Sequence, residues 1–209
     1  MDRILIQGGR RLSGEIRVSG AKNAVLPQMV AALLSKGVST LRNVPELRDV
    51  QTMATVLEQL GARVSRGDGY VTIDASGFAN HEAPYDIVRK MRASVYVLGA
   101  MLARLGRARV SLPGGCAIGA RPVDLHLKGF EALGAQIDIE RGYIVADGRA
   151  MRGAEMNLEG PQGSSVGATC NVLLAAALTP GRTVMHGAAR EPEVGEVVRM
   201  LNLMGARIT

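Results

Sequence analysis

The chain has 209 residues, 47% of them hydrophobic and only 3% aromatic, and its 25 basic and 19 acidic side chains give a net charge of +6. This length allows a substantial core, and the longest nearly apolar runs, 93–103 and 172–178, are too short for a membrane span of roughly 18 residues. The composition therefore excludes a membrane-spanning chain. The charge favours an anionic partner, either a nucleic acid or a phosphorylated metabolite.

The start of the chain and its cysteines indicate the compartment. MDRILIQGG lacks the layout of a secretory signal, and two cysteines are too few for a disulfide framework. The three histidines have no metal-ligand spacing to each other or to the cysteines. We therefore expect a cytoplasmic protein with neither metal nor cofactor. Few aromatic residues also weigh against nucleic acid, whose bases stack on rings.

In chain order, RILIQGGRRLSGEIRVSG (3–20) predicts a β-hairpin. One pattern then occurs three times, and each copy has the order strand, helix, strand, helix, strand, strand. The second helix of each copy ends in Leu-Gly-Ala or Met-Gly-Ala, and glycine in this place closes a helix. The three copies cover about 20–80, 81–150 and 151–209.

Local signals place the elements within the first two copies. PQMVAALLSKG predicts a helix that begins near Pro27 and stops at Gly37, in the proline-first, glycine-last manner. VSTLRNV (38–44) is rich in β-branched residues and predicts a short strand. Glycine-containing turns at 66–69 and 140–142 predict hairpins.

Two helical stretches, 95–106 and 170–181, are apolar on nearly every side. A helix without a polar face is buried, so we expect an α/β fold with its helices inside and its sheets outside. Cys170 lies among apolar residues of the second stretch and is expected to be a small core residue. The third copy stops at Thr209 after ARIT, the expected first arm of a hairpin whose return strand is missing, so we expect the chain to continue.

Polar or cationic residues stand where the first helix of each copy begins. They are Lys22 and Asn23 in SGAKNAVLP, Arg92 in VRKMRASV, and Ser164 and Ser165 in GSSVGAT. Helix N-termini bind phosphate well, so the three helix starts together predict an anion-binding region. At each single position, a solvated lysine or a serine that only caps its helix is the alternative.

A glycine-rich loop interrupts the second copy. SLPGGCAIGARPVDLHL (111–127) places Cys116 among small residues, with Arg121 and Asp124 close behind. Such a loop can close over a ligand, and a nearby arginine lowers the pKa of a thiol. Cys116 is therefore a candidate acid or nucleophile, and the alternative is a surface cysteine without a role.

The chain resembles the enolpyruvyl transferase family, in particular the members that use UDP-N-acetylglucosamine. The strings SGAKNAVLP, MRASVYVLG, PGGCAIGARPVDLHL, SVGAT and AAREPE carry the likeness, which covers this chain but only half of the family's length. The resemblance implies an inside-out α/β barrel of three units over 20–209, with residues 1–19 belonging to the other, mostly absent domain. It implies transfer of the enolpyruvyl group of phosphoenolpyruvate to the 3′-hydroxyl of UDP-N-acetylglucosamine, for peptidoglycan synthesis.

The resemblance also implies roles for single residues. Cys116 would protonate phosphoenolpyruvate and could form a covalent adduct with it, and Asn23 would contact the reacting centre. The cations Lys22, Arg92 and Arg121 would hold anionic groups. A uridine-gripping segment and a diphosphate-facing helix start would supply the other contacts: Arg121, Pro122, Val123, Asp124, Leu125, Ser164, Ser165, Val166 and Gly167. Gly163 stands where some members carry lysine, and the missing half would supply the general base and further arginines.

Two other functions stay open from the sequence. The sister enzyme that makes 5-enolpyruvylshikimate 3-phosphate shares the fold and the donor, although PGGCAIGARPVDLH suits a nucleotide sugar better. A non-catalytic RNA- or nucleotide-binding repeat protein would also fit the basic charge, and it would be indifferent to replacement of Cys116.

Overall fold

The computed structural model describes residues 3–83, 85–88, 91–112 and 123–209, apart from the side chains of Ile87 and Arg92. Its elements alternate between helix and strand, which confirms the expected α/β class. The helices are α1 (Lys22–Ala31), α2 (Arg48–Gln59), α3 (Tyr85–Val88), α4 (Val97–Leu105), α5 (Asp124–Ala132), α6 (Val166–Ala176) and α7 (Pro192–Leu203), with the short 3-10 helices η1 (Ala32–Leu34) and η2 (Arg92–Tyr96). The strands are β1 (Val38–Arg42), β2 (Arg63–Gly67), β3 (Tyr70–Asp74), β4 (Glu82–Ala83), β5 (Arg107–Ser111), β6 (Gln136–Glu140), β7 (Tyr143–Asp147), β8 (Glu155–Asn157) and β9 (Val184–His186).

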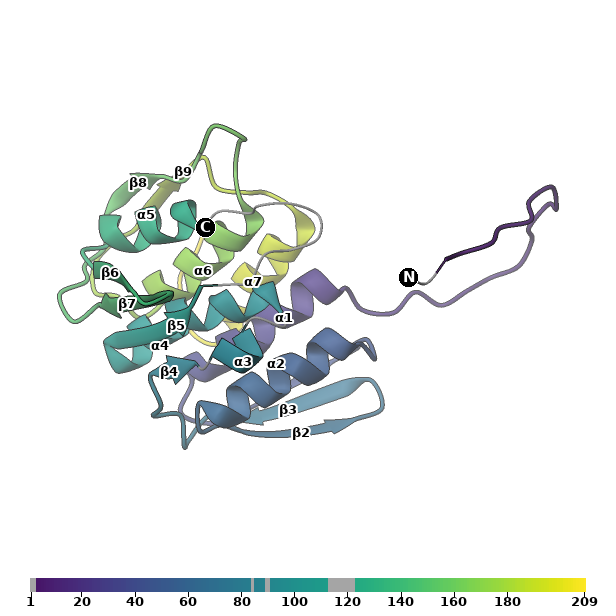
Figure 1. Ribbon diagram of the computed structural model, residues 1–209, viewed down its shortest axis with the longest axis horizontal. Helices are drawn as coiled ribbons and strands as arrows, with labels where there is room; N and C mark the ends of the chain where they lie inside the picture. The colour runs from purple at the N-terminus through teal and green to yellow at the C-terminus, as the bar shows by residue number, and fades with distance from the viewer. Residues whose placement is uncertain (1–2, 84, 89–90, 113–122) are drawn as a thin grey trace.

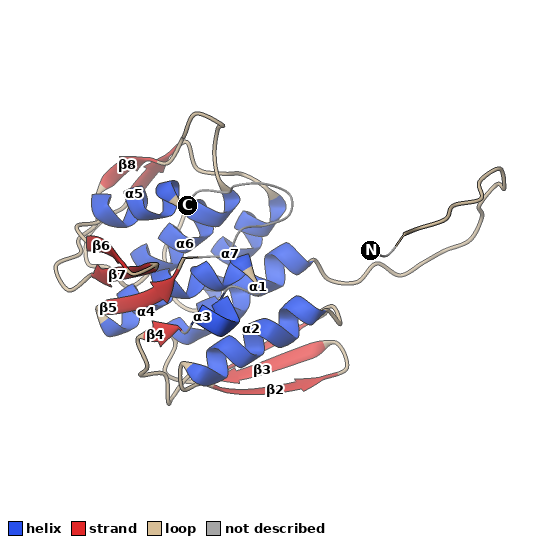
Figure 2. Ribbon diagram, in the orientation of Figure 1, coloured by secondary structure: helices blue, strands red, loops and turns tan. Residues whose placement is uncertain are grey.

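Within the described residues the strands form three separate sheets, which lie around a group of helices (Figure 1, Figure 2). The strand order is β1-β3-β2 in the first sheet, β4-β5-β7-β6 in the second and β8-β9 in the third. The pairs β4–β5 and β8–β9 are parallel, and the other pairs are antiparallel. Along the chain, at least one helix lies between the two strands of each parallel pair, because a parallel connection must cross back to the other end of the sheet.

The strands of the first two sheets pair in the same register, which one aspartate in each sheet illustrates. Asp74 pairs with the first residue of β1 and the first residue of β2, and Asp147 does the same with β5 and β6. Each of these aspartates also accepts a hydrogen bond from an arginine, Arg63 or Arg149. These hydrogen bonds are the main reason why the pKa of each carboxyl is lowered to about 2.

Glycines close the helices and turns where the sequence predicts them. Gly61, Gly134 and Gly205 follow α2, α5 and α7 with φ angles of 100°, 95° and 105°, in the left-handed region that glycine adopts without strain. The turn between β6 and β7 consists of Arg141 and Gly142, both with positive φ, which suits the twist of a two-residue hairpin.

The sequence signals give two different starts for α1, and the structure decides between them. The helix begins at Lys22 and contains Pro27 as an interior residue, so the expected start near Pro27 is wrong and the expected start at Lys22 and Asn23 is confirmed. Proline has no N–H to donate to the carbonyl four residues before it. That carbonyl belongs to Asn23, which lies in the exposed first turn, where water can replace the missing backbone partner.

Helices α4 and α6 form the centre of the core, as their apolar sequences predict. Residues 97–102 of α4 and 168–175 of α6 are buried, and the two helices pack directly against each other. Their contact depends on Gly99, where a Cβ atom would lie 2.3 Å from the backbone oxygen of Asn171. In the part of the chain that the structure describes, no helix has the length and apolar character of a membrane span.

The first residues do not form the strands of the predicted hairpin. Residues 3–20 run as extended chain away from the helices and double back near the tip (Figure 1). Ile4, Leu5 and Ile6 expose more than four-fifths of their surface, at 88%, 96% and 83%. A two-stranded hairpin without a packed face is marginal in water, which accounts for the absence of a ladder here. The assignment of residues 1–19 to another domain stays a prediction.

Replacement of Gly99 by alanine tests the α4–α6 contact. We expect Gly99→Ala to lower the free energy of unfolding by about 2–3 kcal/mol, because the new methyl group must displace the α6 backbone. The matched control is Gly195→Ala in α7, where the Cβ position is open; it should raise stability by about 0.5–1 kcal/mol through helix propensity. Urea denaturation of the two variants measures both effects. Equal unfolding midpoints for Gly99→Ala and Gly195→Ala would contradict the close approach of the α4 and α6 backbones.

Candidate functional site

The predicted site residues lie at the starts of α1, η2, α5 and α6 and in the stretch of sequence between β5 and α5. Cys116, Arg121 and Pro122 lie outside the described residues, and of Arg92 only the backbone is described. The structure places the remaining predicted residues at the starts of three helices: Lys22 and Asn23 on α1, Val123, Asp124 and Leu125 on α5, and Ser164, Ser165, Val166 and Gly167 on α6.

The starts of α5 and α6 lie side by side. The Leu125 side chain covers Gly160 in the loop before α6, where a Cβ atom would lie 3.2 Å from its Cδ1. One residue further, the His126 ring lies against Gly167, whose Cβ would be 3.2 Å from Nε2. The two segments predicted to bind the sugar nucleotide are therefore brought together, although about 40 residues separate them in the sequence.

The start of α6 has the features of an anion site and also a cap of its own. Ser165 is the N-cap, and its Oγ accepts a hydrogen bond from the backbone N–H of Ala168 at 3.3 Å. This contact confirms the capping role that the sequence left as the alternative. Ser164 is exposed, and the remaining N–H groups of the first turn carry the positive end of the helix dipole.

Lys22 stands at the start of α1 and has a partner. Its Nζ lies 3.0 Å from Oδ2 of Asp49 in the first turn of α2, and its side chain is about half exposed. A solvent-exposed ion pair of this kind contributes little to stability. An anionic ligand can therefore replace Asp49 as the partner of Lys22 at small cost.

Helix η2 carries the predicted cation of the second copy. Helix η2 packs against both α1 and α6, and Arg92 is its first residue. The neighbouring cations Arg89 and Lys90 lie outside the described residues. The elements that carry the three predicted helix starts are thus neighbours, as an anion-binding region requires.

A buried amide whose role the sequence does not reveal connects α6 with η2, α4 and α5. Asn171 is fully buried in α6 and bonds to Gly99 at the start of α4 and to His126 of α5. In the sequence, Asn171 stands out as the one side-chain amide within the apolar run CNVLLAAAL. A buried polar side chain almost always has hydrogen-bond partners, but the sequence does not reveal which ones.

Cys170 is a core residue, as predicted. It is fully buried in α6, and burial raises the pKa of its thiol to about 12, with smaller contributions from the negative charges of Glu193 and Glu191. A thiol reacts as the thiolate, so Cys170 is unsuited to act as a nucleophile near neutral pH.

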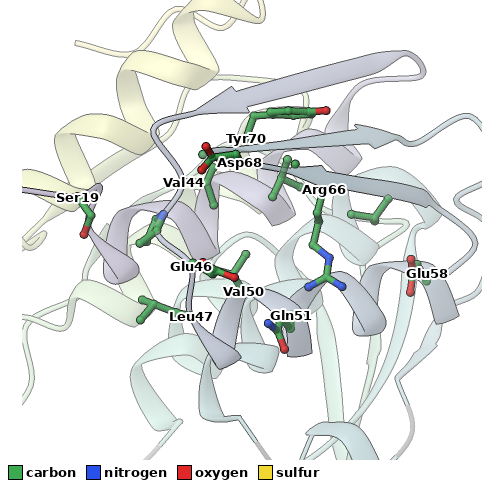
Figure 3. Close-up of a pocket in the computed structure, with 15 residues that line it drawn as sticks. Ser19, Val44, Glu46, Leu47, Val50, Gln51, Glu58, Arg66, Asp68 and Tyr70 are labelled. Carbon is green, nitrogen blue, oxygen red and sulfur yellow. The ribbon is translucent and has the colours of Figure 1, made fainter.

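A groove of about 800 Å³ lies elsewhere, between α2 and the β2–β3 hairpin (Figure 3). Arg66 reaches from the hairpin toward Gln51 and Glu58 of α2, while Glu46 lies near the start of that helix. The lining combines one arginine with several carboxylates and a floor of valines. None of the predicted site residues that the structure describes lines this groove.

Solved enolpyruvyl transferases share the arrangement of these elements. The enolpyruvyl transferase NikO from Streptomyces tendae superimposes with a TM-score of 0.83 at 26% identity, over 97% of this chain and 47% of that protein. An EPSP synthase from Acinetobacter baumannii gives a TM-score of 0.71 at 18% identity, over 94% of this chain and 44% of its own; this likeness concerns the fold alone. The chain thus has the fold of an enolpyruvyl transferase.

Sequence comparison assigns the family. Residues 6–209 match the profile described as EPSP synthase (3-phosphoshikimate 1-carboxyvinyltransferase). Proteins named UDP-N-acetylglucosamine 1-carboxyvinyltransferase from Desulfosudis oleivorans and Sorangium cellulosum are 54% and 56% identical over 209 residues. The chain belongs to this enolpyruvyl transferase family, and it spans 49% of the length of these two relatives.

The burial of Cys170 has a direct chemical test. In a Cys116→Ser variant it is the remaining one of the two cysteines, and we expect no reaction with a disulfide reagent at about pH 8, because almost no thiolate is present. Unfolding in guanidinium should release one thiol per chain. A rapid reaction of the native variant would contradict the buried position.

Proposed function

We propose that this chain forms the first half of a UDP-N-acetylglucosamine 1-carboxyvinyltransferase. The observation that carries the proposal is the identity of more than 50% over the whole chain with relatives of that name. The reaction moves the enolpyruvyl group of phosphoenolpyruvate to the 3′-hydroxyl of UDP-N-acetylglucosamine and releases phosphate. In this proposal the enzyme works in the cytoplasm, at the first committed step of peptidoglycan synthesis.

The proposal includes the domain architecture. Residues 20–209 would form one inside-out domain of three units, and residues 1–19 would belong to the second domain. The shared hairpin register of the first two sheets and the parallel pairs β4–β5 and β8–β9 support the repeat. The exposed apolar side chains of residues 4–6 support a partner surface outside this chain, because so many exposed apolar residues mark an interaction site.

The reaction proceeds by addition and then elimination. Cys116 donates a proton to the methylene carbon of phosphoenolpyruvate, and the sugar hydroxyl oxygen attacks the neighbouring carbon while a base takes its proton. The tetrahedral intermediate then loses phosphate, and loss of a proton from the methyl group restores the carbon–carbon double bond. A general acid positioned in this way contributes about 10²–10⁴-fold to the rate.

Cations and helix starts hold the anionic parts of the substrates. Lys22, Arg92 and Arg121 would bind the phosphate and carboxylate of phosphoenolpyruvate, next to Asn23 at the reacting centre. The displaceable ion pair of Lys22 with Asp49 supports this role, since the lysine is exposed and needs little rearrangement to take an anion.

The sugar nucleotide would lie across the starts of α5 and α6. Arg121 through Leu125 would hold the uridine, with Asp124 bonding to its polar edges, and 164–167 would face the diphosphate. The contact between these two segments supports the assignment. Because Gly163 carries no cation, the diphosphate would rely on backbone N–H groups at the start of α6.

The acceptor distinguishes this proposal from the sister reaction on shikimate 3-phosphate. Relatives at 51–56% identity carry the UDP-N-acetylglucosamine name, whereas the EPSP synthase structure is only 18% identical. Calorimetric titration of the full-length enzyme with each acceptor decides between them. Binding of shikimate 3-phosphate without binding of UDP-N-acetylglucosamine would overturn the proposal.

Replacement of the loop thiol tests the mechanism. In a full-length enzyme that carries this chain, Cys116→Ala should lower kcat by about 10²–10⁴-fold, because the proton donor is lost. Binding of UDP-N-acetylglucosamine should persist, because the acceptor lies on other residues. Cys170→Ala is the matched control and should leave kcat unchanged. Undiminished turnover of the Cys116→Ala enzyme would refute the proposed acid.

The 209-residue chain by itself should release phosphate from the two substrates at a negligible rate. The family resemblance assigns the general base and further arginines to the other half, so the transition state would lack these charges. A phosphate-release assay on the purified chain, with the full-length enzyme as the positive control, measures this. Turnover by the chain at a rate typical of enzymes would show that these groups are dispensable.

A further inference from the structure

The side-chain amide of Asn171 lies at the centre of a buried hydrogen-bond network. Its Oδ1 accepts a hydrogen bond from the N–H of Gly99, and its Nδ2 donates to the carbonyl oxygen of Val95, both at 2.9 Å. The same Nδ2 lies 3.0 Å from Nδ1 of His126, which is buried as well. One amide on α6 thus contacts η2, α4 and α5.

These partners determine the orientation of the amide and the state of the histidine. A backbone N–H can only donate and a backbone carbonyl can only accept, so the oxygen of Asn171 faces Gly99 and its nitrogen faces Val95. The second hydrogen on Nδ2 then points to Nδ1 of His126, which must accept it. Neutral His126 therefore carries its proton on Nε2.

The position of the amide explains the change of helix type next to it. Val95 and Gly99 are four residues apart, the spacing of a backbone hydrogen bond in a continuous α-helix. The α-helical geometry begins only at Val97, after the 3-10 turns of η2. Asn171 supplies a partner to both groups at this junction, so it holds the end of η2 and the start of α4 against α6.

His126 connects the Asn171 amide to the first turn of α5. It lies two residues after Asp124, and its ring is wedged between Asn171 and Gly167, which are one helical turn apart on α6. Loss of the bond to Asn171 would remove one of the contacts that hold the ring against α6 and would allow it to shift. Leu125 and Asp124 would then move with it relative to Ser164 and Ser165.

We propose that Asn171 is a positioning residue for the sugar-nucleotide side of the site and acts through His126. The inference rests on the proposed function, because it assigns the neighbouring starts of α5 and α6 to UDP-N-acetylglucosamine. Neither side chain needs to touch the substrate. Their role is to set the distance between the two segments that do.

Two substitutions of His126 in the full-length enzyme test the proposal. Leucine fills the space of the ring but cannot accept a hydrogen bond, whereas the Oδ1 of asparagine lies near the former position of Nδ1 and can. We expect His126→Leu to raise the KM and Kd for UDP-N-acetylglucosamine about tenfold or more, the size of effect that the loss of one buried hydrogen bond produces. His126→Asn should recover most of this loss, and kcat should change little in either variant.

The adjacent buried residue on the same helix supplies the control. Cys170→Ala removes volume from the core without touching the network, so it should lower the melting temperature and leave the Kd for UDP-N-acetylglucosamine unchanged. An equal rise in Kd for His126→Leu and His126→Asn would overturn the proposal. A rise for Cys170→Ala as large as that for His126→Leu would overturn it as well, because general loss of packing would then explain both.

A spectroscopic measurement separates this proposal from the proposed function. Nitrogen NMR of the His126 ring in the full-length enzyme should show the proton on Nε2 in the wild type. Asn171→Asp, whose carboxylate cannot donate to Nδ1, should lose this preference. A proton on Nδ1 in the wild type would overturn the network whatever the enzyme binds. Failure of the wild type to bind UDP-N-acetylglucosamine, with the expected ring spectrum, would instead overturn the proposed function.

Discussion

The close contact between α4 and α6 is the constraint on which the rest of the molecule depends. Gly99 allows the two backbones to approach, and the approach places the Asn171 amide within hydrogen-bond distance of the α4 backbone. Since both helices are buried on nearly every side, their polar groups must find partners within the protein. The sheets can then lie only on the outside, where their edges and exposed faces meet solvent.

The elements around this contact carry the predicted helix starts. Helix η2 leads into α4 and packs on α1 and α6, so these elements are neighbours. Each start contributes unpaired backbone N–H groups and part of a dipole. Helix starts in general suit ligands that carry phosphate, because their backbone N–H groups bind anions without a lysine or arginine for every oxygen.

The two cysteines illustrate how surroundings decide the chemistry of one side chain. Cys170 lies in the core beside the carboxylates of α7, and both features oppose its ionisation. Cys116 lies in a segment of small residues with Arg121 nearby in the sequence, and a guanidinium stabilises a thiolate. Of the two cysteines, only Cys116 has neighbours in the sequence that favour ionisation of a thiol.

The sequence by itself determined most of the helices and strands after residue 20, the closing glycines Gly61 and Gly134, the turn at 141–142 and the core position of Cys170. These features depend on residues within one or two turns of each other, so local patterns reveal them. Tertiary structure alone decided that Lys22 pairs with Asp49 and that residues 3–20 form no ladder. It also decided the partners of Asn171, which lie 45 to 76 positions away. A hydrogen bond over such a separation depends on how whole helices pack, and no local pattern of residues records that.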